Sequence, residues 1–196
     1  LTEKQKDFAR KYFDEEVESN VIPILLHDHV QLPYLREKSL YLGIAMRRKD
    51  WKFETKFAII EVPAKANGRF VILPTEKPEE TDIMLLEDVI AFNLPHIFSY
   101  FGYDDFKANS FKVTKDAEFD LDNDIRTSFV EKIEKGIKSR RKGKPTRFVF
   151  DKDMDKSLVE FLIKKLNLTK RDSIIPWQKI HNFRHFMDFT YVFKNY

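Results

Sequence analysis

Apolar and polar residues alternate between residues 111 and 121, broken only at Lys115, and this is the clearest hydrophobic pattern in the chain. Such alternation predicts a long strand with one buried face, because successive side chains of a strand point to opposite sides. Asn123 or Asp124 can then cap a helix over 125–137, where apolar residues recur at every fourth position. A short apolar strand at 148–150 follows, and this order of elements is typical of the core of an α+β domain.

The N-terminal part of the chain begins with a predicted helix. Thr2 and Gln5 have the spacing of a capping box, and an apolar stripe follows over the next turns until Asn20. Four apolar or alternating segments then predict extended structure. They are residues 21–26, 40–46, 57–62 and 69–73.

Turn residues indicate how these segments are connected. Gly68 marks a turn between the last two of them, so we expect the three segments from residue 40 to residue 73 to form an antiparallel meander. The linker at 75–81 is rich in proline and glutamate and is expected to be exposed. Pro95 is expected to kink or split a helix over 86–97.

The remaining patterns complete the predicted fold. Aromatic residues crowd the segment 98–106, which favours a place in the core or in an interface over ligand binding. Asp155 can cap a helix that ends at Asn167, the segment 173–176 is extended, and Asn182 can cap a last short helix. We therefore predict an α+β fold in which helices pack on an antiparallel sheet of about five strands.

Length and composition limit the classes of protein that fit. The chain has 196 residues, enough for one large domain, and no shift in composition divides it. Its net charge is only +3, so any affinity for anions must come from local clustering, and no nucleic-acid partner is expected. The chain has no cysteine, which excludes a disulfide, a thiolate metal site and a cysteine nucleophile.

The longest apolar run, at 21–26, is too short to span a membrane and contains Pro23. No signal peptide precedes it, so we expect a cytoplasmic protein, with association at a membrane surface left open. The chain begins inside a predicted helix and ends abruptly at Tyr196. We therefore expect a single domain over residues 1–196 that is excised from a longer multidomain enzyme.

No catalytic motif is present in the sequence. It contains no phosphate-binding loop, no dinucleotide fingerprint, no nucleophile elbow and no His-Glu-x-x-His motif, so no catalytic residue is assigned. Four acids between Asp120 and Glu131 have the spacing of a calcium loop, but Ile125 occupies the position that requires glycine. No calcium site is therefore expected there.

Two pairs of histidines are also weak candidates for a metal site. His27 and His29 lack further ligands at any recognisable spacing, which favours a solvated loop. His181 and His185 could share one helix face, but a surface or interface role is favoured for them. No metal site is assigned.

The basic segment 135–147 is the strongest functional signal, with seven cations in thirteen residues and no acid. A helix C-terminus explains about two or three of these cations, because they complement the helix dipole. Arginine and lysine in a loop are also good phosphate ligands. Three interpretations of the basic segment therefore remain open. Its cations bind an anion, they form a solvated helix end, or they pair with the acids at 116–124. The predicted anion-binding residues are Lys138, Arg140, Arg141, Lys142, Lys144 and Arg147.

Asp-Ser-Ile-Ile-Pro at 172–176, with His-Asn-Phe at 181–183, is the most specific part of a pattern that extends over essentially the whole chain. In the order of its segments, this pattern resembles the middle, or head, domain of the bacterial polyphosphate kinase family. This chain has Trp177, Gln178 and Lys179 where the family usually carries a Gly-Gly-Arg-like step. The other matching segments are 12–16, 22–25, 32–35, 39–40, 86–90, 113–118 and 151–154.

The resemblance implies a function for the parent enzyme. Members of the family transfer the terminal phosphate of ATP reversibly to polyphosphate, with magnesium, through a phosphohistidine in domains that follow the head domain. None of the five histidines here matches that residue. The family's head domain is α+β, has been likened to phosphoinositide-binding PX domains, and contributes to dimerisation.

We therefore expect a non-catalytic domain that needs no cofactor of its own, while the parent enzyme uses ATP and magnesium. Its expected partners are other domains of the same polypeptide, a second copy in a homodimer, and polyphosphate or ATP in the parent enzyme. An independent PX-like module that binds phosphorylated lipids is the main alternative. Nucleic-acid binding has only the basic segment in its favour.

Overall fold

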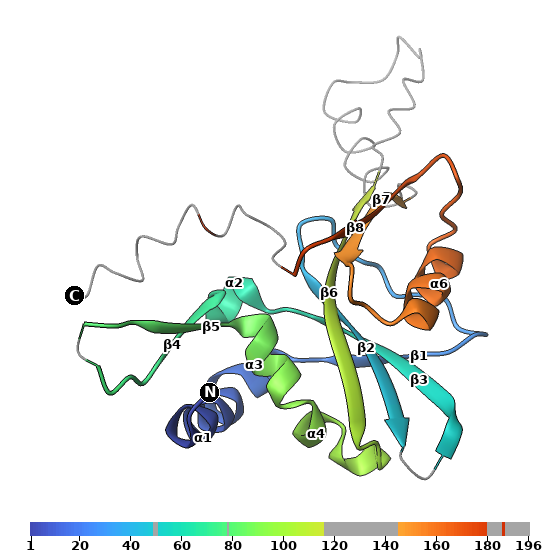
Figure 1. Ribbon diagram of the computed structural model, residues 1–196. Coiled ribbons are helices and arrows are strands. Elements are labelled where there is room, and N and C mark those ends of the chain that lie inside the picture. The colour runs from blue at the N-terminus through green and yellow to red at the C-terminus, as the bar shows by residue number, and fades with distance from the viewer. Residues whose placement is uncertain (49–50, 78, 116–144, 180–185, 187–196) are drawn as a thin grey trace, which may run out of the picture.

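The structure is a computed structural model that describes residues 1–48, 51–77, 79–115, 145–179 and 186, with the backbone alone at 51–54. Over these residues it is a mixed α+β fold with a six-stranded sheet, a separate two-stranded sheet and short helices (Figure 1). The α+β prediction is confirmed. The main sheet has six strands rather than about five.

The main sheet has the strand order β1-β3-β2-β6-β7-β8, and all neighbours are antiparallel except β7 and β8. Helix α6 (Lys156–Lys165) lies between β7 and β8 in the chain and provides the long connection that parallel strands require. The strands are β1 (Pro23–Leu26), β2 (Tyr41–Arg48), β3 (Trp51–Glu61), β6 (Asp105–Lys115), β7 (Pro145–Asp151) and β8 (Ser173–Trp177).

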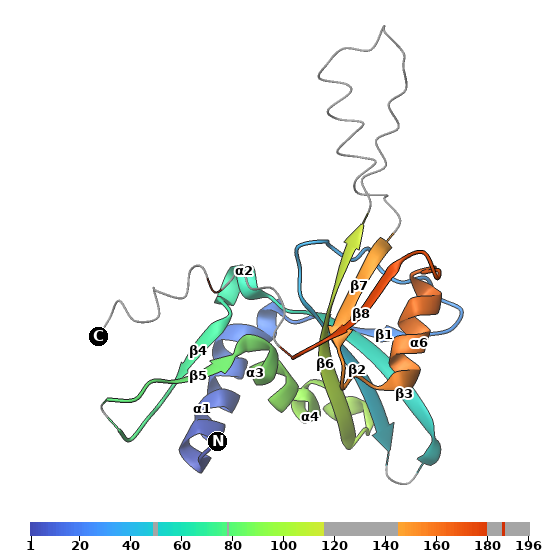
Figure 2. The ribbon, with the colours of Figure 1, turned by 45° about the horizontal axis from the view of Figure 1, so that its top comes forward.

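Strand β2 is buried on both faces, because a separate hydrophobic core packs on each side of it. Leu42, Ile44 and Met46 belong to the first core, with residues of the N-terminal and central helices. Tyr41 belongs to the second core, with side chains of α6 such as Leu158. Figure 2 shows α6 beside β7 and β8, with the helices of the first core on the other side of the sheet.

The first core is covered by helices whose ends the sequence marks well. Helix α1 (Glu3–Tyr12) has the predicted capping box between Thr2 and Gln5, and continues through η1 (Phe13–Val17) and η2 (Glu18–Asn20). The predicted break near Pro95 is confirmed, because α3 (Leu86–Phe92) ends before α4 (Leu94–Ile97) begins. Between these two helices the buried Asn93 side chain donates to the backbone oxygens of Val89, at 2.9 Å, and Ala9.

The predicted meander is correct for β2 and β3 but wrong for its third strand. Strand β4 (Phe70–Leu73) pairs with β5 (Asp82–Leu85) in a sheet of its own. The short helix α2 (Ala64–Asn67) and Gly68, with φ of 73°, lie between β3 and β4 in place of a tight turn. Strand β5 was not predicted, since it directly follows the proline- and glutamate-rich linker.

A buried ion pair connects this small sheet to α3. Arg69 and Glu87 are 1% and 3% exposed, and Nη2 of Arg69 lies 2.5 Å from Oε1 of Glu87. The backbone N–H of Leu86 also donates to the backbone oxygen of Arg69, at 2.8 Å. The Phe186 ring lies 5.7 Å from the Arg69 guanidinium carbon. Removing one partner of such a pair leaves the other charge buried and unpaired, which is strongly destabilising.

The C-terminal half agrees with the remaining predictions where it is described. Strand β6 begins at Asp105, six residues before the predicted start, and β7 extends the predicted strand at 148–150 in both directions. Asp155 caps α6, Asn167 follows it with φ of 53°, and the extended tail is strand β8. The predicted strand beyond residue 115, the helix over 125–137 and the last helix near residue 182 lie outside the described residues.

The space around Gly43 shows how closely the second core packs on β2. A Cβ atom at this position would lie 3.1 Å from Cδ2 of Leu158 and 3.3 Å from Cε of Met154. We predict that Gly43→Val lowers the free energy of unfolding by about 1–3 kcal/mol, because overpacking forces neighbouring side chains out of place. Urea denaturation of the protein measures this change.

The control for this prediction is Leu158→Ala, which removes the nearest obstacle. In the double variant the two losses of stability should be clearly less than additive, because each substitution compensates the other. Strictly additive losses would show that the valine clashes elsewhere.

Candidate anion-binding face

Five of the six predicted anion-binding residues lie outside the described part of the chain: Lys138, Arg140, Arg141, Lys142 and Lys144. For these five, anion binding therefore stays a prediction. Arg147 is described, and it lies on β7 with an exposed side chain.

The alternation of β7 places Arg147 on the face of the sheet away from α6. Phe148 and Phe150 belong to the second core with the α6 side chains, so the side chains of Arg147 and Val149 point to the opposite face. Arg147 is in register with Thr114 of β6 and with Ser173 of β8, and all three side chains are exposed. A guanidinium group therefore lies between two hydroxyl groups across three strands.

A second cation lies on the same face, one register step away. Lys112 of β6 is half-buried and in register with Val149, so it is a diagonal neighbour of Arg147 across the β6–β7 pair. Burial lowers the pKa of the Lys112 ammonium, and the nearby positive charge of Arg147 lowers this pKa further. We call Lys112, Thr114, Arg147 and Ser173 the Arg147 face.

Within the described part of the chain, no acidic side chain forms an ion pair or hydrogen bond with Lys112 or Arg147. Asp151, the acid at the far end of β7, accepts hydrogen bonds from Nδ2 of Asn109 and from the backbone N–H of Asp153 instead. Like charges on diagonal positions of neighbouring strands repel each other. The Arg147 face is thus suited to an anion with several oxygen atoms.

Three other described cations on or near the sheet, Arg47, Lys115 and Lys179, have partners. Arg47 contacts the Asp155 carboxylate, with Nη2 2.5 Å from Oδ2. The Lys115 ammonium lies 3.8 Å from the centre of the Tyr34 ring. Lys179, which follows β8, pairs with Asp88 at 2.8 Å. These contacts distinguish the Arg147 face from ordinary paired surface charge.

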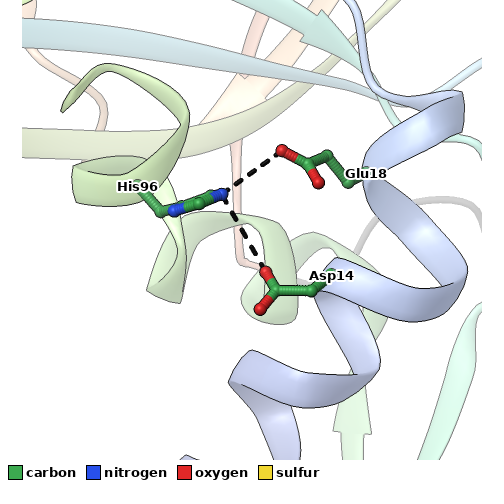
Figure 3. Close-up of side chains that lie close together, drawn as sticks. All are labelled: Asp14, Glu18 and His96. Carbon is green, nitrogen blue, oxygen red and sulfur yellow. Dashed lines mark hydrogen bonds and ion pairs between the residues drawn. The ribbon is translucent and has the colours of Figure 1, made fainter. Parts of the chain in front are cut away.

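A second cluster, in the first core's helices, brings together Asp14, Glu18 and His96 (Figure 3). Nε2 of His96 lies 3.2 Å from Oε1 of Glu18 and 3.9 Å from Oδ1 of Asp14. The sequence did not indicate it, because His96 is 78 residues from Glu18. Two carboxylates and an imidazole are chemically able to hold a divalent ion. All three side chains are more than half exposed, however, and exposed ion pairs of this kind are common.

A pocket of about 400 Å³ lies where β1, β2 and β3 meet the loop before β2. Its wall is mainly apolar, with Ile24, Leu40 and Ile59. Of the charged residues that line it, Arg36 and Glu61 pair with each other at 3.2 Å.

Among the described helices, none is long and apolar enough to cross a membrane.

Comparison with known proteins gives one consistent result. The family model of the polyphosphate kinase middle domain matches residues 4–189. The polyphosphate kinase of Vibrio cholerae is 35% identical over 199 residues, which cover 100% of this chain and 28% of that protein. The polyphosphate kinase of Escherichia coli K12 is 35% identical over 197 residues, covering 99% of this chain and 28% of that protein.

The fold has a solved counterpart in the crystal structure of polyphosphate kinase from Porphyromonas gingivalis. The TM-score is 0.72 at 24% sequence identity, over 94% of this chain and 25% of that one. The matched class is thus the middle domain of a phosphotransferase, and the chain spans just over a quarter of the length of these relatives. The chain belongs to the polyphosphate kinase family.

Proposed function

We propose that this chain is the non-catalytic middle domain of an enzyme that transfers the terminal phosphate of ATP reversibly to polyphosphate. The match of the middle-domain family model over residues 4–189 carries this proposal. The absence of a nucleotide-phosphate motif from the sequence supports the non-catalytic role. ATP and magnesium are then used by parts of the cytoplasmic parent enzyme outside this chain.

The domain's proposed role is to guide the polyanion. Lys138, Arg140, Arg141, Lys142, Lys144 and Arg147 would form a lane for polyphosphate. A row of cations without intervening acids binds a polyanion by releasing its counterions, so the affinity falls as salt is added. The exposed position of Arg147 on β7, as the last cation of the basic segment, supports this role.

The domain is also proposed to contact a second subunit in a homodimer and other domains of its own polypeptide. Within the aromatic segment, Phe98 is buried, but Tyr100 and Phe101 on η3 (Ser99–Phe101) are 98% and 47% exposed. Neighbouring exposed aromatic rings are typical of interface centres. Nothing in the net charge of +3 favours nucleic acid as a further partner.

The first prediction of this proposal is that the 196-residue chain alone is not phosphorylated by ATP. The phosphate-accepting histidine would lie outside it. Incubation with radiolabelled ATP at alkaline pH, followed by gel analysis, measures this, with the full-length enzyme as the positive control. A stable phosphohistidine on the isolated chain would contradict the non-catalytic role.

The second prediction concerns the polyphosphate lane. Replacing Arg140, Arg141 and Lys142 together by glutamine in the full-length enzyme should weaken polyphosphate binding or shorten the product chains, because the counterion-release contribution falls. Chain length on a urea gel and binding affinity are the measurements. The fold should remain intact in a thermal melt.

The matched control neutralises three exposed lysines elsewhere: Lys4, Lys152 and Lys170. This variant has the same change in net charge and should keep the wild-type chain length. Lost thermal stability with unchanged chain length in the first variant would instead favour pairing of the basic segment with the acids at 116–124.

The third prediction concerns assembly. Replacing Tyr100 and Phe101 by serine in the full-length enzyme should shift it toward the monomer, because their exposed rings would lose apolar contact with the partner. Light scattering measures the mass, and Ile22→Ser, at a residue 72% exposed, is the control. An unchanged dimer in the double variant would place the interface elsewhere.

A further inference from the structure

We infer that the Arg147 face is a binding site for a phosphoanhydride chain, in which Lys112 and Arg147 hold phosphate oxygens and Thr114 and Ser173 donate hydroxyl hydrogen bonds. A phosphoanhydride chain is common to polyphosphate and to the triphosphate of ATP. The inference rests on the proposed function for the identity of the ligand. It adds three residues, Lys112, Thr114 and Ser173, that the basic segment does not contain.

The sheet fixes the geometry of this site. Thr114, Arg147 and Ser173 form one row across β6, β7 and β8, and Lys112 belongs to the next row. Diagonal neighbours on paired strands lie roughly 7–8 Å apart, with their Cβ atoms somewhat closer, so two long side chains can reach one phosphate or two adjacent phosphates. The backbone of paired strands is ordered before binding, so less backbone freedom is lost than in a loop, which favours affinity.

The charges of the site favour an anion over a structural role. Lys112 is half-buried beside a second cation, and no acid in the described part of the chain pairs with either one. By contrast, Lys179 and Arg47 contact carboxylates at 2.8 Å and 2.5 Å. Two cations brought together at a cost in repulsion are explained if a phosphate ligand neutralises them.

The surroundings of the site also suit an extended ligand. Val149 and Ile175 lie in the Lys112 row and are half-buried, so they offer no polar group that competes for the phosphate oxygens. Arg147 is also the last cation of the basic segment. The described residues of this face therefore adjoin, in sequence, a segment that is rich in cations.

The test uses the full-length enzyme and polyphosphate of one defined length. Lys112→Gln and Arg147→Gln should each weaken binding about tenfold, the change expected for losing one charge-assisted hydrogen bond. Each variant should also reduce the slope of log affinity against log salt by roughly one, because one phosphate contact is lost. Arg147→Lys should retain most of the affinity, since it keeps the charge.

Two control variants distinguish the effect of losing this site from the effect of lowering the net positive charge. Lys107→Gln removes an exposed cation from the same strand but from the opposite face, in register with Ala45. Arg171→Gln removes an exposed cation from the loop before β8. Both should bind polyphosphate as the wild type does. Equal weakening in these controls would overturn the inference, because it would show an effect of net charge alone.

The affinity for ATP, measured in the same variants, distinguishes the two sources of the ligand. Weaker binding of polyphosphate alone assigns the face to the polymer, and weaker binding of ATP assigns it to the nucleotide. Wild-type affinity for both ligands in Lys112→Gln/Arg147→Gln, with enzyme that still makes polyphosphate, would overturn the inference and leave the proposed function intact. A wild-type enzyme that makes no polyphosphate from ATP would instead refute the proposed function.

Discussion

The burial of β2 on both faces is the constraint on which the rest of the structure depends. Each of its residues from Tyr41 to Met46 is buried, so each face of the sheet must be covered at this strand. The helices of the first core cover one face and α6 covers the other. The first core includes no described residue of β7 or β8, so that face of the sheet is left for polar side chains at the β7–β8 end.

This arrangement explains where a binding surface can form. At β7, α6 buries Phe148 and Phe150 on one side, and the alternation of the strand then presents Arg147 on the other side. Ser110, nearer the sheet centre on the same face of β6 as Lys112, is already buried and donates to the backbone oxygen of Lys179. Lys112 and Arg147 lie farther from the sheet centre than Ser110, on strands that also contribute to the second core. Rigid strands of this kind position binding groups more accurately than loops do.

Local signals in the sequence predicted the ends of elements well, and non-local pairing was predicted poorly. The caps at Thr2 and Asp155 depend on neighbouring residues only, so they could be predicted from the sequence. The pairing of β4 with β5 is accompanied by a buried contact between Arg69 and Glu87, 18 residues apart, which no local pattern reveals. Lys112 shows why part of the site was missed. A single lysine in an alternating strand is typical of a solvated face, and only the register with β7 places it beside Arg147.

A structure of the full-length enzyme with bound polyphosphate tests most directly whether the middle domain contacts the phosphate chain through the Arg147 face. We predict phosphate oxygens at about 3 Å from the Arg147 guanidinium and the Lys112 ammonium, the length of a charge-assisted hydrogen bond. Acidic side chains from another domain or subunit paired with both cations, and a polyphosphate path that avoids β6, β7 and β8, would contradict it.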